Sequence, residues 1–172
     1  MTLVVAMALA LAGADAGARA QTAAAVPKDV ATLAGQHPAE YYRRAAARFG
    51  EGRKDDAVFL FYLGQLRYRA HLSARRDELK PDGDPALFAS LSEVVGRPLN
   101  EYAFGDIPAL VKILDAVLDY DRANPDRFTP PSQFPQAYAS HRGGLASLKG
   151  QIARDVEQIR AKRRENKLEN RN

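Results

Sequence analysis

The stretch DDAVFLFYLGQLRYRAHL, residues 55–72, decides the fold of this protein. Asp55 and Asp56 place a carboxylate where an α-helix can begin, because a side-chain oxygen there accepts a hydrogen bond from a free backbone N–H. Small and aromatic residues share one helical face: Ala57, Phe61, Gly64 and Tyr68. Larger apolar residues cover much of the remaining surface: Phe59, Tyr62, Leu63 and Leu66. A helix with so much apolar surface is buried on more than one side, so we predict that it packs between other elements.

A second helix is predicted immediately before this stretch. Pro38 suits the first turn of a helix, because the N–H that proline lacks is unpaired there in any case. Between Ala39 and Phe49 four residues share one helical face: Tyr42, Ala45, Ala46 and Phe49. The glycines of Gly50-Glu51-Gly52 end this helix. The two helices are therefore predicted to form a tight helical hairpin.

The spacing of residues in this hairpin is that of a known repeat. Eight residues carry the spacing: Tyr42, Ala45, Ala46, Phe49, Gly52, Ala57, Phe61 and Gly64. On these residues the segment from about residue 39 to about residue 70 resembles a tetratricopeptide repeat. That family has bulky residues on the first helix and small residues where the two helices touch. Because arrays of such repeats need about three units to bury a continuous core, we expect one tetratricopeptide-like hairpin inside a small helical domain.

The rest of the chain is divided by prolines, glycines and capping residues. Asp106 is suited to cap a helix with Pro108 in its first turn, and the prolines that follow Phe128 prevent a continuous helix there. No segment alternates polar and apolar residues as a strand does, so we predict an all-α fold of about five helices. The elements expected after the hairpin are a turn-rich loop over 77–85, a short helix over 86–95 that Gly96 ends, an irregular stretch over 97–105, a helix from Asp106 to Asn124, an extended proline-rich loop over 128–135 and a last helix from about Gln136 to beyond Arg160.

The first twenty residues are typical of a secretory signal peptide. The run from Thr2 to Gly13 is apolar and too short to span a bilayer. Ala18-Arg19-Ala20 has the small-x-small form that signal peptidase accepts, which would leave Gln21 as the first residue of the exported chain, and Ala14-Asp15-Ala16 is a second option. No basic residue precedes the apolar run, which we attribute to a true start upstream of Met1. The predicted divisions are a signal peptide over 1–20, a partly ordered Ala-rich leader over 21–36, a helical domain over 37–160 and a charged, projecting tail over 161–172.

Composition excludes several classes of protein. Of the 172 residues, 46% are apolar and 27% are charged, a balance typical of one globular domain. Without cysteine the chain forms neither disulfides nor a thiolate metal site. Most of the formal charge of +4 lies in the segment from Arg154 to Arg171, where charges of both signs are typical of a solvated helix end. We therefore expect no nucleic-acid partner and no membrane span.

Two groups of residues are candidates for binding a partner. Gln65, Arg67 and Arg69 lie on the otherwise apolar second helix. Arginines that are buried must meet carboxylates or carbonyls, so the alternative role is an internal salt bridge to one of three acids: Asp106, Asp119 or Asp121. The second group belongs to the proline-rich loop: Phe128, Pro130, Pro131 and Phe134. Aromatic residues on a restricted loop contact a partner at low entropic cost, but these two phenylalanines could equally fasten the loop to the core.

Residues suited to catalysis or metal binding are present but scattered. Each of the three histidines, His37, His71 and His141, stands alone in its segment, without the spacing that puts two ligands on one helical face. We therefore expect no metal site and no cofactor. Asp82-Gly83-Asp84 lacks the further ligands of a calcium loop and is predicted to be a turn. Three acids could supply the carboxylates of a glycan hydrolase, although they are explained more simply as caps and solvated charges: Glu93, Glu101 and Asp106.

An exported helical domain without a catalytic motif is expected to work by binding another protein in the periplasm. One such class is the immunity protein, which neutralises a periplasmic toxin through surface complementarity alone. A tetratricopeptide-like adaptor in an envelope assembly and a cell-wall hydrolase are the two alternatives.

Overall fold

The computed structural model describes residues 26–172, so the predicted signal peptide and the first part of the Ala-rich leader lie outside the described residues. Within this part of the chain every regular element is helical, which confirms the all-α prediction. None of these helices combines the length and the apolar character that crossing a membrane requires. The α-helices are α1 (Ala39–Gly50), α2 (Lys54–Ala74), α3 (Asp84–Leu91), α4 (Arg97–Ala103), α5 (Ile107–Ala123), α6 (Pro135–Arg154) and α7 (Val156–Glu165).

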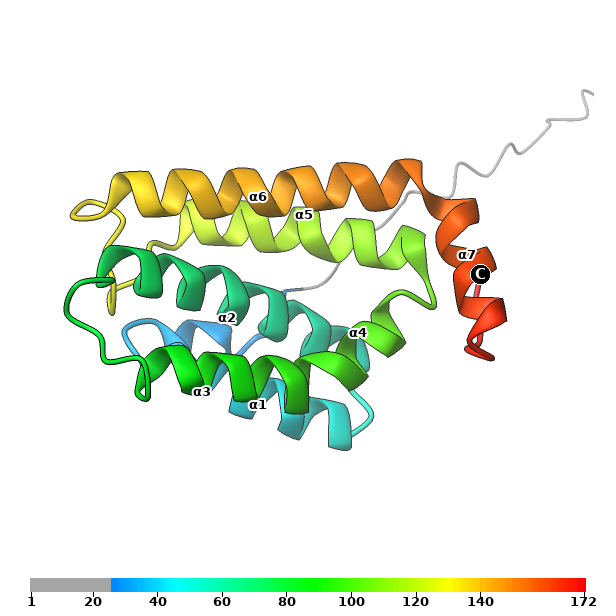
Figure 1. Ribbon diagram of the computed structural model, residues 1–172, viewed down its shortest axis with the longest axis horizontal. Coiled ribbons are helices and arrows are strands. Elements are labelled where there is room, and N and C mark those ends of the chain that lie inside the picture. Colours follow the sequence, from blue (N-terminus) through cyan, green and yellow to red (C-terminus); the bar gives the residue numbers. More distant parts are fainter. Residues whose placement is uncertain (1–25) are drawn as a thin grey trace, which may run out of the picture.

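Helix α2 is the centre of the fold (Figure 1). It lies between a layer that contains α1 and α3 and a layer that contains α5 and α6, and it contacts all four. From Ala57 to Leu66 every residue of α2 is buried except the half-buried Gln65. The apolar character of α2 on all sides therefore reflects packing against two layers, as predicted.

Helices α1 and α2 form the predicted hairpin, and their backbones approach closely at Gly64. A Cβ atom at Gly64 would lie 2.5 Å from Cβ of Tyr41. Real Cβ atoms do not come this close, so any larger residue at position 64 would push the two helices apart. Tyr41 and Tyr42 are fully buried against α2.

Helix α3 continues through one π-helical segment, η2 (Ser92–Gly96), into α4. The prediction that Gly96 ends a helix and that residues 97–105 are irregular is therefore wrong. A Cβ atom at Gly96 would lie 2.8 Å from Cζ of Phe61, so this glycine permits close packing on α2 rather than ending a helix. Pro98 lies in the first turn of α4, directly after the π-helical segment.

The folded part of the chain begins before His37. Val30 and Leu33 of a short 3-10 helix, η1 (Val30–Leu33), are buried in the core. Asp29 pairs with Arg44 and Arg48, both on α1. The second half of the predicted leader is therefore part of the domain.

The C-terminal end turns back onto the domain. Helix α6 ends at Arg154, and α7 leaves it at an angle (Figure 1). Arg163 is buried and donates from Nη1 to the backbone carbonyl of Glu101 over 2.9 Å. The guanidinium of Arg171 lies 3.7 Å from the ring centroid of Tyr102. The prediction of a projecting tail is therefore wrong, because its arginines find backbone carbonyls and an aromatic ring on α4.

Candidate functional site

Arg67, one of the predicted partner-binding residues, lies in the interior with its side chain 1% exposed. Its Nε donates to Oδ1 of Asp121 over 3.0 Å, and its Nη2 donates to the backbone carbonyl of Asn124 over 2.6 Å. Nη1 donates to the hydroxyl of Tyr41. Arg67 therefore makes the internal salt bridge that was its alternative role, and it cannot contact a partner at the surface.

The buried polar network continues into α6 and the proline-rich loop. Asp121 also accepts a hydrogen bond from Nε of Arg142 over 2.8 Å. Asp126 is 2% exposed and accepts from the hydroxyl of Tyr138 over 3.0 Å and from the backbone N–H of Thr129 over 3.1 Å. Burial raises the pKa of Tyr138 well above its ordinary value, so this phenol keeps its proton and donates it. The network therefore fastens the chain after α5 to α2 and α6.

The proline-rich loop packs on the domain. The ring of Phe128 lies 5.1 Å from the ring of His37 and 5.1 Å from the ring of His71, measured between centroids. The ring of Phe134 lies 5.3 Å from the guanidinium carbon of Arg75. All four predicted loop residues are half-buried: Phe128, Pro130, Pro131 and Phe134. These contacts agree with the alternative in which the two phenylalanines fasten the loop.

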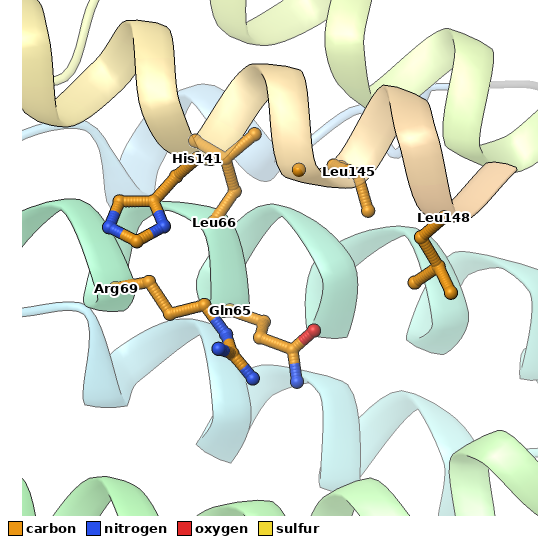
Figure 2. A pocket seen from close by; sticks show the side chains of 7 residues that line it. Gln65, Leu66, Arg69, His141, Leu145 and Leu148 are labelled. Atoms are coloured by element: carbon orange, nitrogen blue, oxygen red, sulfur yellow. The ribbon is translucent and has the colours of Figure 1, made fainter.

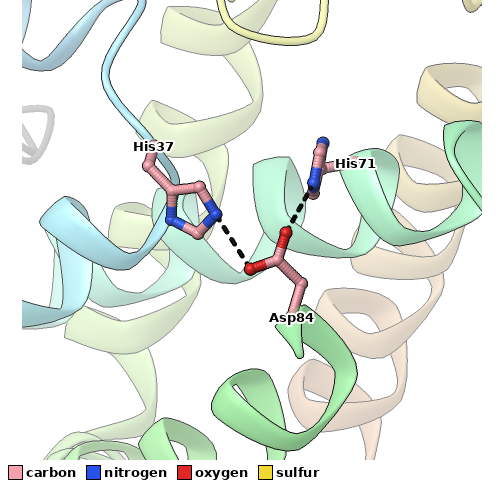
Figure 3. A group of neighbouring side chains, drawn as sticks. All are labelled: His37, His71 and Asp84. Atoms are coloured by element: carbon pink, nitrogen blue, oxygen red, sulfur yellow. Dashed lines mark hydrogen bonds and ion pairs between the residues drawn. The ribbon is translucent and has the colours of Figure 1, made fainter. Parts of the chain in front are cut away.

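The fold brings His37, His71 and Asp84 together (Figure 3). They come from the segment before α1, from the end of α2 and from the first residue of α3. Nε2 of His37 lies 3.1 Å from Oδ1 of Asp84, and Nε2 of His71 lies 3.0 Å from Oδ2. Each of these two histidines stands alone in its sequence segment, but they meet at one carboxylate in the fold. Sequence spacing detects ligands that share one helix and misses those that meet through tertiary packing.

Hydrogen bonds at the other ring nitrogens bear on which nitrogen of each histidine carries the proton. Nδ1 of His37 accepts the backbone N–H of Ala39 over 3.2 Å, which leaves the ring proton on Nε2, facing Asp84. Nδ1 of His71 lies 2.9 Å from the hydroxyl of Thr129, which can donate or accept. Burial alone raises the pKa of Asp84, but the hydrogen bonds from both histidines outweigh it and hold that pKa below its ordinary value. Asp84 is therefore an ionised carboxylate shared by two imidazoles.

The cluster has the donor atoms of a metal site. Two imidazole nitrogens and one carboxylate oxygen lie within 4.8 Å of one another. Thr129 is fully buried, so a substrate cannot reach its hydroxyl. This threonine is therefore not placed to act as a catalytic nucleophile. The geometry is therefore suited to holding an ion or joining segments rather than to nucleophilic catalysis.

A hollow of about 250 Å³ lies between α2 and α6 (Figure 2). Two of the predicted partner-binding residues, Gln65 and Arg69, line the hollow on its α2 side, and both are labelled in Figure 2. We call this hollow the α2–α6 groove and define it by its lining residues: Gln65, Leu66, Arg69, His141, Gly144, Leu145 and Leu148. Of the predicted residues on α2, the structure therefore places two at an open surface and one, Arg67, in the core.

The α2–α6 groove carries one permanent positive charge. Arg69 is exposed, and among residues 26–172 it forms no ion pair with a carboxylate. Its guanidinium carbon lies 5.3 Å from the ring centroid of Phe88 on α3. Nε2 of His141 lies 2.7 Å from the hydroxyl of Ser73. Burial and then the charge of Arg69 lower the pKa of His141, so this imidazole is neutral near neutral pH.

The acids considered for glycan hydrolysis have structural partners. Oδ1 of Asp106 accepts the backbone N–H of Ala109 over 3.0 Å, which confirms it as the cap of α5. Glu93 pairs with Arg97 at the surface over 3.0 Å, and Glu101 is exposed. Their interpretation as caps and solvated charges is therefore the simpler one.

No protein-family model, no curated protein and no solved structure matches this chain.

Proposed function

We propose that this protein is a protein-binding module, and that its α2–α6 groove receives a partner segment that carries an acidic side chain beside apolar ones. The observation that supports the proposal is the exposed guanidinium of Arg69, which has no carboxylate partner among residues 26–172 and lies beside Leu66 and Leu145. A carboxylate from another molecule would complete the ion pair that Arg69 lacks.

Arginine in such surroundings is well suited to binding. Its planar guanidinium forms two parallel hydrogen bonds with a carboxylate, and arginine is frequent among the residues that dominate binding energy. Contact with Phe88 restrains the side chain before binding, so less rotational freedom is lost on association. Leu66, Leu145 and Leu148 supply the apolar surface that a neighbouring partner side chain would cover.

One glycine of α6 supports the same surface. A Cβ atom at Gly144, which lines the groove, would meet nothing within 4 Å, so packing within the described chain does not require glycine there. Glycine inside a helix costs about 0.5–1 kcal/mol relative to alanine. Close approach of a partner backbone at this point supplies the missing reason.

Export of the chain, proposed from residues 1–20, places the partner outside the cytoplasm. The class that we favour is an immunity protein that neutralises a periplasmic toxin, and the alternative is an adaptor built on a tetratricopeptide-like hairpin. In the first case the partner is one secreted toxin, whereas in the second it is a component of the cell envelope.

The proposal is tested by selecting peptides from a random phage-displayed library on the purified protein. We expect the enriched peptides to combine Asp or Glu with Leu, Ile or Phe. Fluorescence anisotropy of one enriched peptide then compares Arg69→Ala with Arg76→Ala, since Arg76 is an exposed arginine outside the groove. Arg69→Ala should weaken binding by about tenfold or more, as expected for a central arginine, and Arg76→Ala should leave it unchanged.

A second variant tests the shape of the groove separately from the charge of Arg69. Gly144→Leu leaves Arg69 in place and fills part of the groove, so it should also reduce binding. Enriched peptides without acidic residues, or equal affinity for the wild type and Arg69→Ala, would contradict the proposal.

A further inference from the structure

His37, His71 and Asp84 form a three-sided arrangement of donors in which no two of the residues belong to the same helix (Figure 3). We propose that these three side chains bind one divalent transition-metal ion, with Zn²⁺ as the ion that the donors favour. The proposal is independent of the α2–α6 groove, none of whose residues belongs to the cluster.

The types of donor identify the class of ion. Imidazole nitrogen is a ligand for zinc, copper, iron and nickel, whereas calcium and magnesium prefer sites made of oxygen. Two imidazoles and one carboxylate therefore select a transition metal. Because this set leaves a fourth position of a tetrahedral ion without a protein ligand, water would complete the coordination.

The distances agree with such a site. Around a tetrahedral zinc ion with bonds of roughly 2.0–2.1 Å, neighbouring ligand atoms lie about 3.4 Å apart. Nε2 of His37 lies 3.1 Å from Oδ1 of Asp84 and Nε2 of His71 lies 3.0 Å from Oδ2, so each nitrogen is near a different oxygen of the carboxylate. All three donor atoms lie within 4.8 Å of one another. His37 precedes α1 and its side chain is 30% exposed, so an ion in the solvent can reach this ring.

Neighbouring groups hold the donors in place. Nδ1 of His71 lies 2.9 Å from the hydroxyl of the buried Thr129, which can accept a hydrogen bond from a protonated Nδ1, the tautomer in which Nε2 has a free lone pair for the metal. The hydroxyl of Tyr68 lies 3.3 Å from Oδ1 of Asp84. Phe128 packs against both imidazole rings. Metal-ligating histidines are usually oriented by such contacts to the opposite ring nitrogen.

Metal binding requires a change of tautomer at His71, whose Nε2 donates to Asp84 in the metal-free protein, and at His37. In the metal-free protein the ring proton of His37 is on Nε2 and its Nδ1 accepts the backbone N–H of Ala39 over 3.2 Å. When Nε2 binds the ion, the proton moves to Nδ1 and the N–H of Ala39 loses this acceptor. The resonance of the Ala39 amide therefore reports directly on metal binding at His37.

The test starts from protein freed of metal with EDTA and dialysed. Calorimetric titration with Zn²⁺ should give one ion per chain, and Co²⁺ should produce the visible absorption of a four- or five-coordinate site. At a free Zn²⁺ concentration about a hundredfold above Kd, the wild-type Tm should rise by about 5 °C or more. Asp84→Asn and His37→Gln should abolish the titration signal and the Tm rise. His141→Gln is the matched control and should retain both, because His141 is outside the cluster.

Two results would overturn the metal site. One is a wild-type protein that shows no Tm rise and no Co²⁺ absorption; the other is an equal response in wild type, Asp84→Asn and His37→Gln. Circular dichroism checks that each variant is folded. If Asp84→Asn unfolds, the comparison is made with His37→Gln, because the side chain of His37 is 30% exposed. An Ala39 amide resonance that does not move on saturation with Zn²⁺ would exclude His37 as a ligand and so contradict the three-residue site.

Discussion

Arg67 and Asp121 form an ion pair in the interior, with Nε of Arg67 3.0 Å from Oδ1 of Asp121 and neither side chain more than 1% exposed. Asp121 also accepts a hydrogen bond from Arg142, so Asp121→Asn removes a shared carboxylate from two guanidinium groups and leaves Arg67 with Asp126, 3.9 Å from its Nη1. We expect this variant to lower the free energy of unfolding by about 3 kcal/mol, the lower end of the cost of removing one partner of a buried ion pair. Urea unfolding followed by circular dichroism measures the difference.

The matched control is Asp119→Asn, which lies on the same helix. Asp119 pairs with Arg122 at the surface, where the two side chains are 78% and 55% exposed. Exposed pairs contribute about 0–1 kcal/mol. A loss of similar size in the two variants would show that the interior pair has no special role.

Gly64→Ala tests the contact between α1 and α2. The added Cβ would lie 2.5 Å from Cβ of Tyr41, so the helices must separate. We expect a loss of about 1–3 kcal/mol in the free energy of unfolding, as for other overpacked cores. Differential scanning calorimetry should show a lower Tm than in the wild type.

The comparison variant for Gly64→Ala is Gly143→Ala. A Cβ at Gly143 meets nothing within 4 Å, and alanine is the better helix former by about 0.5–1 kcal/mol. This variant should therefore raise the Tm. If Gly64→Ala raised the Tm as Gly143→Ala is expected to do, helix propensity would outweigh any clash with Tyr41, and the close contact would be contradicted.

The pKa of His141 provides a test of the charge in the α2–α6 groove. Burial lowers this pKa, and the positive charge of Arg69 lowers it further. Arg69→Ala removes the second cause, so the pKa of His141 should rise toward its ordinary value without reaching it. An NMR titration of the ring proton measures this, with Arg76→Ala as the variant in which no change is expected. A pKa that Arg69→Ala leaves unchanged would place the guanidinium farther from His141 than the structure does.

Asp29 makes the stability of the protein depend on acid pH. Burial alone raises its pKa, but the hydrogen bond from Arg48 and the charges of Arg48 and Arg44 hold it below the ordinary value of 3.8. A carboxyl whose pKa is lower in the folded state stabilises the protein above its unfolded pKa, and the contribution is lost as pH falls through the folded pKa. Between about pH 5 and about pH 3, Asp29→Asn should lose less stability than the wild type in urea unfolding. Parallel losses in the two proteins would contradict this role of Asp29.

The secondary structure was largely predictable because its signals are local. The carboxylate of Asp106 caps α5 as its position before Pro108 indicates, and the apolar surface of α2 predicted burial on several sides. The prediction was wrong at Gly96, because this glycine permits close packing against Phe61 of α2 and does not end a helix. A glycine that ends a helix and one that permits close packing are identical in sequence.

The candidate site was less predictable, because its residues meet only in the folded chain. Periodicity, caps and turn residues act between neighbours, so the sequence by itself determined most of the helices and the burial of α2 on several sides. For the arginines of α2 it left two roles open, partner binding and an internal salt bridge. Only the tertiary structure decided that Arg67 is buried on Asp121 while Arg69 faces the groove. It also brought His37 to Asp84 across 47 positions of the sequence. Such a contact depends on how several helices pack around α2, and no local pattern of side chains records that packing.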